Sequence, residues 1–288
     1  MISTDLKIDL HTHSTASDGT LAPTTLAKAA KEAGLCALAL TDHDTIGGIV
    51  EFYSACANEG IEGIAGVEIS ADYTKEMHIV GLFVDIHDRA LNEKLSVLKN
   101  GREVRNREML RLINQHGFDI SEDDILSQKD GATLLNTGRA HIARAMVEKG
   151  YVENTSEAFS KYLKKGRPCY VKRITCSPEE SIKIIKESGG IAILAHPIYI
   201  TQEYDKLYAL LAALKEYGLD GTECYYNCYD RQFSQDCTDI CKKLGLLMSG
   251  GSDFHGSNKP SVHLGHVSTG FVPYRLLLNM KLKRGLHK

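Results

Sequence analysis

Short apolar runs recur along the chain, and each of them ends in polar residues. These runs lie at 6–10, 35–40, 61–67, 77–84, 191–195 and 246–249. Segments with helical spacing separate most of the runs, and such alternation is typical of a mainly parallel sheet with both faces covered. With weaker strand candidates at 221–226 and 266–270, the chain offers about seven or eight strand–helix repeats. The alternation therefore predicts a closed or distorted α/β barrel.

Start and stop signals support the intervening helices. The segment 23–33 begins with a proline in its first turn and is followed by Gly34. Ser177 precedes a proline and two glutamates, a pattern that favours a helix start, and a Gly-Gly pair ends the same segment. Residues 205–217 and 231–244 have comparable patterns.

The alternation stops in a long charged stretch that contains no continuous apolar strand run. Helical spacing occurs there at 90–115, 139–149 and 155–165. An α/β barrel typically takes about 250 residues, so a chain of 288 residues has room for an insertion. We predict a barrel formed by 1–90 and 175–288, and a helical insertion, 91–174, that closes over the active site.

Composition excludes several classes of protein. Charged residues make up 25% and hydrophobic residues 43% of the chain, values typical of a soluble protein with a sizeable core. No apolar run approaches the roughly 20 residues of a membrane span, and the N-terminus lacks the pattern of a secretory signal. The net charge of −3 argues against a broadly basic surface that coats nucleic acid. We expect a cytoplasmic protein with reduced cysteines, no membrane association and no obligate protein partner.

Histidine and acidic residues gather in six short motifs. These are DLHTH with the following SDG, TDHD, GVE, MHI, AHP and GGSDFH. In each motif the histidine or acid stands where an apolar run ends or is ending, and in a parallel barrel those positions face one mouth, where active sites form. We therefore expect nine side chains to converge there. They are His11, His13, Asp18, His43, Glu68, His78, His196, Asp253 and His255.

The chemistry of these nine side chains favours a metal site. Imidazole and carboxylate groups suit Zn, Mn and Fe, and His11 and His13 alternate so that both can point inward from one strand. So many ionisable groups at one mouth would be costly to remove from water without cations. A lone histidine at a strand end is more often a packed core residue, but packing does not explain six histidines and three acids in the same context.

These motifs also carry a family resemblance. HTHSTASDG, TDHD, GVEIS, HIVGL, AHP and GSDFH resemble the ordered motifs of the polymerase and histidinol phosphatase (PHP) superfamily, over residues 8–256. The aspartate of SDG and the segment RAHIARAM at 139–146 are similar to the stand-alone phosphoesterase branch. That branch includes nucleoside 3′,5′-bisphosphate phosphatases and a related 5′→3′ exoribonuclease. Histidinol phosphatases and polymerase-attached PHP domains are similar but more distant.

The resemblance implies a distorted (β/α)₇ barrel, like a TIM barrel, that holds three divalent metal ions. By matching motif positions, the first ion takes His11, His13, Glu68 and Asp253, the second takes Asp18, His43 and His255, and the third takes Glu68, His78 and His196. Glu68 would then span two ions with its two oxygens. The mixed nitrogen and oxygen ligands admit Mn, Zn or Fe.

The resemblance and the metal chemistry together predict a phosphoesterase. We expect it to hydrolyse phosphate monoesters of nucleotides, either 3′,5′-bisphosphates or the 5′ ends of short RNA, by a metal-activated hydroxide. The candidate catalytic residues are Asp42, His43, Glu68 and His255. Asp42 could support a ligand imidazole or instead cap a turn. Either Asp42 or Asp44 could protonate the leaving group.

A second phosphate of the substrate would need further cationic groups. Arg139, His141 and Arg144 lie in one predicted helix of the insertion, and His141 and Arg144 share a face at spacing i, i+3. Arg173 lies where the chain rejoins the barrel, next to Lys172. Guanidinium groups match phosphate oxygens in pairs. We predict that these residues hold the non-reacting phosphate; an ordinary solvated helix face is the alternative.

Three alternative functions remain open. They are a small-molecule phosphatase like histidinol phosphatase, a metal-dependent amide or lactone hydrolase, and a non-catalytic metal-binding module. The GVE and GSDFH motifs favour phosphate esters, and the complete ligand set argues against a non-catalytic module.

Two further clusters carry weaker signals. Four cysteines form two C-x₃-C pairs, Cys224 with Cys228 and Cys237 with Cys241. This spacing is wider than a C-x₂-C knuckle, so we expect these thiols to pack as small apolar groups. Glu223, beside them, could reach the barrel mouth. The nearby tyrosines could stack on a base or pack in the core, and they are Tyr225, Tyr226 and Tyr229.

Overall fold

The structure, a computed structural model, describes residues 6–127, 133–135 and 137–286. The chain divides into two compact units, one formed by Met1–Glu93 with Cys176–Lys288 and the other by Lys94–Thr175. We call them the barrel unit and the helical unit. The border between them lies close to the ends of the expected insertion. The closing of this insertion over the active site stays a prediction.

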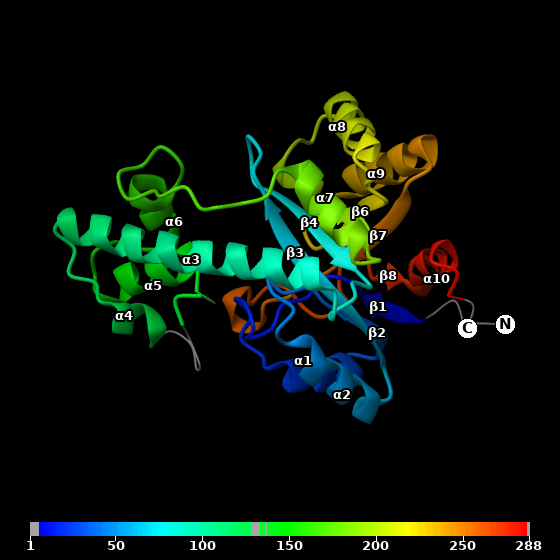
Figure 1. Cartoon of the computed structure of the whole chain (residues 1–288), viewed down its shortest axis with the longest axis horizontal. Coiled ribbons are helices and arrows are strands. Elements are labelled where there is room, and N and C mark those ends of the chain that lie inside the picture. The colour runs from blue at the N-terminus through cyan, green and yellow to red at the C-terminus, as the bar shows by residue number, and fades with distance from the viewer. Residues whose placement is uncertain (1–5, 128–132, 136, 287–288) are drawn as a thin grey trace. The chain divides into compact units, whose positions relative to one another are not determined.

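The barrel unit is built around a sheet with the strand order β7-β6-β5-β4-β3-β2-β1-β8 (Figure 1). Its strands are β1 (Lys7–Asp9), β2 (Leu35–Leu40), β3 (Glu62–Ala71), β4 (Met77–Leu82), β5 (Ile191–Leu194), β6 (Gly221–Tyr226), β7 (Leu247–Gly251) and β8 (Val272–Pro273). The chain after β1 also pairs with β7 and its following loop. The N–H of Leu10 donates to the Gly250 carbonyl (3.3 Å), and the N–H of Asp253 donates to the His11 carbonyl (2.9 Å). Strands β1 to β7 thus form a nearly closed barrel, which confirms the predicted α/β barrel.

Strand β4 departs from the expected parallel arrangement. It runs antiparallel to both β3 and β5. The connection from β3 to β4 is only residues 72–76, whereas a parallel crossover needs about a dozen residues or more. The first residues of β4 therefore lie at the same end of the barrel as the last residues of β3 and β5.

The strand expected at 266–270 is wrong. Val267 and Gly270 pair with each other across a turn, in which Gly270 has a φ of +119°. Glycine adopts this conformation without steric cost, so the segment folds back instead of extending. The last strand is the short β8, which pairs antiparallel with β1.

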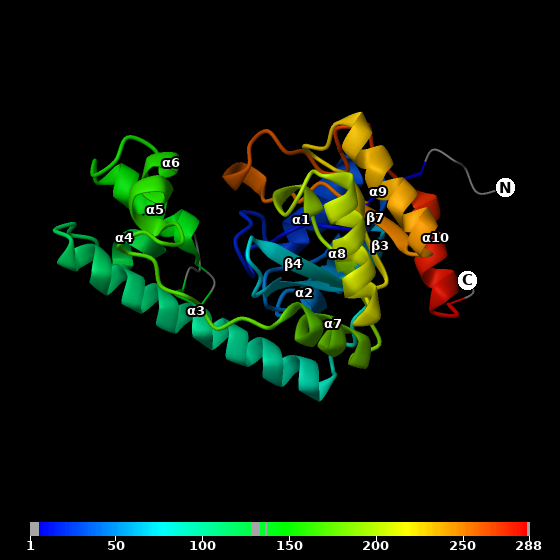
Figure 2. The same ribbon diagram turned by 90° about the horizontal axis from the view of Figure 1, so that it is seen from above.

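Six helices of the described barrel unit pack around the sheet (Figure 2). They are α1 (Pro23–Glu32), α2 (Ile49–Glu59), α7 (Pro178–Glu187), α8 (Tyr204–Glu216), α9 (Arg231–Leu244) and α10 (Tyr274–Lys283). At the start of α7, the Ser177 side chain accepts a hydrogen bond from the Glu180 N–H while Glu180 caps the Ser177 N–H. This capping box confirms the predicted helix start.

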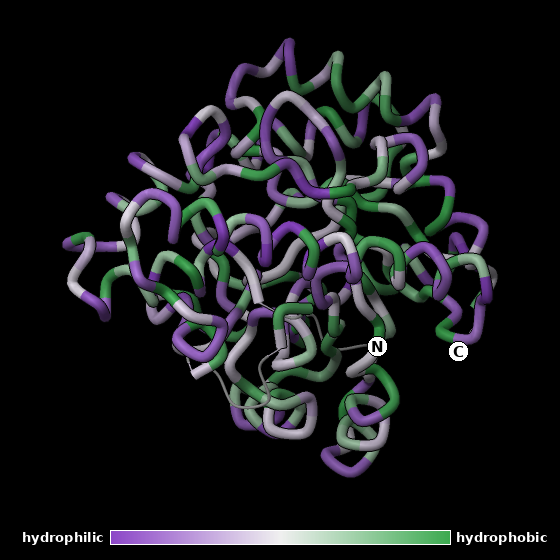
Figure 3. The backbone as a smooth tube through the Cα atoms, turned by 60° about the vertical axis from the view of Figure 1, so that its left-hand side comes forward, coloured by the Kyte–Doolittle hydropathy of each residue, from purple (hydrophilic) through white to green (hydrophobic). Residues whose placement is uncertain are grey.

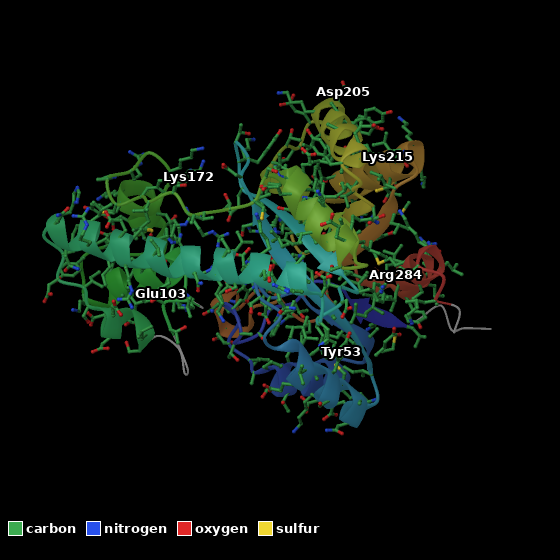
Figure 4. The ribbon with its side chains drawn as sticks, viewed as in Figure 1. Tyr53, Glu103, Lys172, Asp205, Lys215 and Arg284 are labelled. Atoms are coloured by element: carbon green, nitrogen blue, oxygen red, sulfur yellow. The ribbon has the colours of Figure 1, made fainter. Side chains whose placement is uncertain are left out.

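The helices are amphipathic, which explains how they cover the sheet. Leu207 and Leu211 of α8 are buried, whereas Asp205 and Lys215 of the same helix are exposed (Figure 4). Hydrophilic and hydrophobic residues alternate along the helices (Figure 3). Helix α10 places Leu277 in the same core cluster as residues of β1 to β5. No helix among the described residues combines the length and apolar character needed to cross a membrane.

The helical unit contains its own core. Its helices are α3 (Arg89–Gln115), which begins in the barrel unit, α4 (Glu122–Leu126), α5 (Arg139–Glu148) and α6 (Thr155–Ala158). A single helix was expected over 155–165, but α6 is followed by a π-helical turn, Phe159–Leu163, and Lys164 is extended. Met109, Ile113, Ile142 and Met146 belong to one buried cluster.

Candidate metal centre

The predicted ligands of the barrel unit gather at one place. Four groups of side chains each have ligand atoms within 4.8 Å of one another. The groups are His13, Asp18, His43 and His255; His11, His13 and Asp253; His11, Glu68 and His196; and His43, Glu68 and His78. Together they include all nine predicted residues. The assignment of each residue to an ion stays a prediction.

Strand ends bring these side chains together, and His78 shows why topology matters. His78 stands at the start of β4, not at its end. Because β4 is antiparallel, this start lies at the same mouth as the ends of the parallel strands, so the predicted position was right although the predicted strand direction was wrong.

Glu68 lies between two sets of imidazoles. Its Oε1 is 2.8 Å from His78 Nδ1 and 2.9 Å from His196 Nε2. Its Oε2 is 2.9 Å from His43 Nδ1 and 3.4 Å from His11 Nε2. The two oxygens therefore serve different histidines, which is the geometry that a carboxylate shared between two cations requires.

Two aspartates complete the cluster. Oδ1 of Asp253 lies 3.2 Å from His13 Nε2 and 3.4 Å from His255 Nδ1. Asp18 approaches His255 Nε2 at 3.3 Å and His43 Nε2 at 3.7 Å. Each aspartate thus faces ring nitrogens that could share a cation with it.

Several buried atoms in the cluster lack hydrogen-bond partners. They are Oε2 of Glu68 and Nδ1 of both His43 and His196. His43 Nδ1 and Glu68 Oε2 lie 2.9 Å apart. Buried polar atoms are normally satisfied, and a cation bound between this nitrogen and this oxygen would satisfy both. The donor set therefore fits divalent metal ions.

Backbone strain concentrates in the same motifs. The described residues include four non-glycine positions with positive φ, and three are Asp44 (54°), His196 (28°) and Asp253 (56°). Such conformations are costly for residues with a Cβ and cluster at functional sites.

The charges of the cluster shift its pKa values strongly. Burial alone would raise the pKa of the Glu68 carboxyl, but the imidazoles of His43, His78 and His11 hold it well below its usual value. Burial alone would lower the pKa of His13, but Asp253 and Glu68 raise it to about 9. Without a cation, imidazolium and carboxylate groups therefore stabilise one another.

Comparison with known proteins identifies the family. The PHP domain matches residues 9–217 of the chain. The chain belongs to the PHP domain family.

Relatives of this PHP protein share most of its length. It is 39% identical to a 5′-3′ exoribonuclease of Haemophilus influenzae over 86% of the chain and 90% of the relative. It is 33% identical to a 3′,5′-nucleoside bisphosphate phosphatase of Chromobacterium violaceum, over 90% of the chain and 91% of the relative. The predicted resemblance is confirmed, and the relatives agree with the expected class, a metal-dependent phosphoester hydrolase.

Solved structures share the fold, and one of them carries the phosphoesterase name. A structure described as an amidohydrolase of Chromobacterium violaceum, with bound sulfate and no metal, is 33% identical, with a TM-score of 0.82 and 91% coverage of both chains. A protein of Bifidobacterium adolescentis assigned as a metal-dependent phosphoesterase is 28% identical, with a TM-score of 0.83, covering 97% of this chain and 96% of its own. The family and the histidine–carboxylate cluster together support the use of divalent metal ions.

Residues behind the predicted ligands of this PHP protein hold them in place, and the sequence carries only weak signals for them. Glu223 Oε1 lies 2.7 Å from His11 Nδ1, and its Oε2 accepts the His196 N–H at 2.6 Å. Tyr226 is buried and donates to Asp253 Oδ2 at 2.6 Å, so its ring packs in the core instead of stacking on a base. The available signal for Glu223 was an acidic residue within the strand predicted at 221–226, where the structure places it in the middle of β6.

Asp42 supports a loop. Its Oδ1 and Oδ2 accept hydrogen bonds from the N–H (2.8 Å) and Oγ (2.6 Å) of Ser14, and Oδ1 also accepts one from Ser17 Oγ (2.5 Å). These bonds hold the loop that carries Asp18. These contacts are those expected of the turn-capping role, and the other roles expected of Asp42 stay predictions. Asp44 similarly accepts the Ser70 N–H at 3.2 Å.

The predicted phosphate-binding residues lie in the helical unit. His141 is buried, and its Nδ1 accepts the Gly138 N–H at 3.1 Å, so this ring nitrogen caps the start of α5. The Arg139 guanidinium lies 5.8 Å from the centre of the Phe159 ring. Arg144 and Arg173 are each half-buried. On the face that His141 and Arg144 share, one side chain is thus buried and the other is half-buried, and their role in phosphate binding stays a prediction.

The cysteine pairs do not form a metal site with the cluster. Cys224, Cys237 and Cys241 are buried, and the Cys224 and Cys241 sulfurs lie 3.7 Å apart. Cys228 is exposed. No cysteine belongs to any of the four ligand groups found among the described residues. The packing interpretation fits the three buried thiols but not Cys228.

Proposed function

We propose that this PHP protein hydrolyses phosphate esters of nucleotides, with nucleoside 3′,5′-bisphosphates and the 5′ ends of short RNA as substrate classes. The observation that carries the proposal is that the two carboxylate oxygens of Glu68 face separate sets of imidazoles. The relatives named bisphosphate phosphatase and exoribonuclease support the nucleotide class. A cytoplasmic location remains part of the proposal.

The nine clustered side chains are the proposed metal ligands, and we propose three ions because Glu68 can serve two of them. Manganese, zinc and iron all suit imidazole and carboxylate ligands. Bound divalent ions would supply an acidified water and charge neutralisation for the phosphate. The chain's own contribution is orientation: Glu223 fixes the His11 ring and the His196 backbone, and Asp42 fixes the loop of Asp18.

We propose His43, Glu68 and His255 as the residues nearest to the reacting phosphate, with Asp42 acting through the loop that it holds. His43 and His255 belong to the ligand group of Asp18. The side chain of His43 keeps 14% of its surface exposed, whereas that of Glu68 keeps 1%. His43 is therefore the member of this set that a substrate can reach most readily.

A group of arginines in the helical unit supports binding of a second phosphate. Arg105 is buried, and its Nε has no hydrogen-bond partner. Burial lowers the pKa of Arg105, and the charges of Arg102, Arg173 and Arg139 lower it further, in that order. Positive charges gathered in this way favour a bound anion. We keep Arg139, His141, Arg144 and Arg173 as the proposed phosphate-binding residues.

Phosphate release across a substrate panel tests the function. The panel contains nucleoside 3′,5′-bisphosphates, nucleoside monophosphates, short 5′-phosphorylated RNAs, an aryl phosphate, and amide and lactone substrates. We expect turnover of a bisphosphate or RNA that disappears with a chelator and returns with Mn²⁺. Turnover of amides or lactones alone, or of nothing at full metal loading, would contradict the proposal.

Substitution of Arg144 tests the second phosphate site separately. Arg144→Ala should raise KM for a bisphosphate by about 10-fold or more, because a charged hydrogen bond contributes about 1.5–3 kcal/mol. KM for a simple aryl phosphate should change little. Equal effects on both substrates would remove the arginine group from the proposal, while leaving hydrolysis itself intact.

A further inference from the structure

The loop after β7 carries a lysine that belongs neither to the proposed ligands nor to the arginine group. Lys259 follows the short turn Gly256–Asn258, and its Nζ lies 2.5 Å from Asp253 Oδ2. The carboxylates of Asp18 and Glu68 also act on its charge. A cationic side chain is therefore placed directly beside the candidate metal centre.

Hydrogen bonds between two loops hold Lys259 at this place. The Ser257 N–H donates to Thr20 Oγ1 at 3.0 Å, and Asn258 Nδ2 donates to the Asp18 carbonyl at 2.6 Å. These bonds tie the turn before Lys259 to the loop that carries a proposed ligand. The position of the lysine is thus built into the site.

The two oxygens of Asp253 face different partners. Oδ1 faces the imidazoles of His13 and His255, at 3.2 and 3.4 Å. Oδ2 accepts hydrogen bonds from Tyr226 and Lys259. A cation among the imidazoles would meet Oδ1, so Lys259 could keep its contact with Oδ2 in the loaded protein.

Exposure distinguishes the two donors to Oδ2. Tyr226 is 1% exposed, whereas the Lys259 side chain is 40% exposed beside an Asp253 side chain that is 5% exposed. An ammonium has three N–H donors, and among the described residues Asp253 is its only hydrogen-bond acceptor. The ammonium therefore has donors left for a ligand that arrives from solvent.

We propose that Lys259 is a substrate-contacting residue, whose ammonium donates a hydrogen bond to an oxygen of the phosphate group bound at the candidate metal centre. This inference rests on the proposed function. A lysine supplies a compact positive charge that suits a phosphate oxygen. Tyr226 is a positioning residue, because its buried hydroxyl acts on the site through Asp253.

The test compares Lys259→Met and Lys259→Arg with Tyr226→Phe and, as a matched control, Lys206→Met. Lys206 is an exposed lysine of α8 paired with Glu203. Each protein is reconstituted with Mn²⁺, its metal content is measured, and its affinity for inorganic phosphate is measured by calorimetry. Lys259→Met should weaken phosphate binding by about 10–100-fold at unchanged metal content, since a charged hydrogen bond is lost.

The other variants separate contact from positioning. Lys259→Arg should recover part of the phosphate affinity, and Lys206→Met should match the wild type. Tyr226→Phe should leave phosphate affinity per loaded site unchanged. In turnover, Lys259→Met should raise KM for a phosphate ester.

Two results would overturn the inference. One is normal phosphate affinity in Lys259→Met; the other is loss of metal from this variant with normal phosphate affinity in the sites that stay loaded. In both cases a wild type that still hydrolyses phosphate esters would leave the proposed function standing. A fully loaded wild type that neither binds phosphate nor hydrolyses its esters would contradict the proposed function itself.

Discussion

At the scale of single residues, the candidate metal centre depends on which carboxylate oxygen faces which ring nitrogen. Glu223 contacts Nδ1 of His11 and accepts the backbone N–H of His196, and it is almost wholly buried. With Nδ1 held, His11 turns Nε2 towards Glu68. Carboxylates behind a ligand histidine fix its orientation and raise its basicity. Glu223 therefore orients the imidazole of His11 through the ring nitrogen that points away from Glu68.

Glu223→Gln should weaken metal binding by about 10–100-fold, the usual effect of losing a partner behind a metal-ligating histidine. The amide keeps one acceptor, but its NH₂ group would face either the His196 N–H or a proton on His11. Chelator-competition titration with Mn²⁺ or Zn²⁺ measures the change. Glu216→Gln, at an exposed position on α8, is the matched control. Wild-type affinity in Glu223→Gln would show that His11 does not need this carboxylate.

The sequence predicted all nine clustered side chains but ranked their supporting residues low or missed them. His11 and Asp253 stand in motifs that combine a strand end with a ligand type, a local signal. Glu223 acquires its role from His11, 212 positions away, and Lys259 from its contact with Asp253. Such contacts exist only after the barrel closes, so local patterns could not reveal them.

At the scale of elements, the line of contact between the segment after β1 and the segment around the end of β7 closes the barrel. This line, called the seam below, also carries residues of the candidate metal centre. The segment after β1 pairs with β7 and the loop after it, and the N–H of Asp253 donates to the His11 carbonyl. Gly251 lies at this seam, where a Cβ would stand 2.4 Å from His11 Cβ and 2.5 Å from its N. The absence of a side chain at Gly251 is therefore a condition for close approach of the two segments.

Gly251→Ala should destabilise the protein by about 1–3 kcal/mol or more, because overpacking here pushes on backbone and not on a flexible side chain. Metal affinity should fall with it, since His11 is displaced. Urea unfolding and metal titration measure the two effects. Gly47→Ala is the control, since its Cβ would meet only Thr45 Oγ1, at 3.3 Å. Equal unfolding midpoints for the two variants would argue against a tight seam.

Element positions were predicted better than their directions. The run at 77–84 was expected as a strand and β4 occupies Met77–Leu82, but its antiparallel direction follows from a short connection to β3. The apolar run itself carries no directional information. Likewise, 266–270 contains residues that suit a strand, yet glycine geometry turns the chain there.

At the scale of the whole molecule, protonated histidines would supply positive charge beside the buried carboxylates when no metal ion is bound. Burial would lower the pKa of His11, His13 and His78, but facing carboxylates raise all three, to about 9 for His13. Burial would raise the pKa of Glu68 and Asp253, but facing cationic groups lower both. Protons on these three imidazoles thus offset part of the charge of the buried carboxylates.

These shifts give the stability of the metal-free protein a definite pH dependence. Histidines with raised pKa values stabilise the fold below 6.5, and this contribution is lost as pH rises towards about 9. The carboxylates with lowered pKa values stabilise it above about 4.5, the ordinary value for Glu68, and lose this contribution in acid. In chelator, the melting temperature should therefore fall between pH 6.5 and pH 9.

Saturating metal should remove that fall, because coordination takes the same imidazoles in their deprotonated form and metal then competes with protons for them. A ligand at 100 times its Kd also stabilises the folded state by about 2.7 kcal/mol. Melting curves at pH 6 and pH 8.5, with chelator and with Zn²⁺, measure both effects. His116, an exposed residue outside the cluster, supplies the control variant His116→Gln. The same loss of stability on raising pH in both conditions would mean that the metal does not bind these imidazoles.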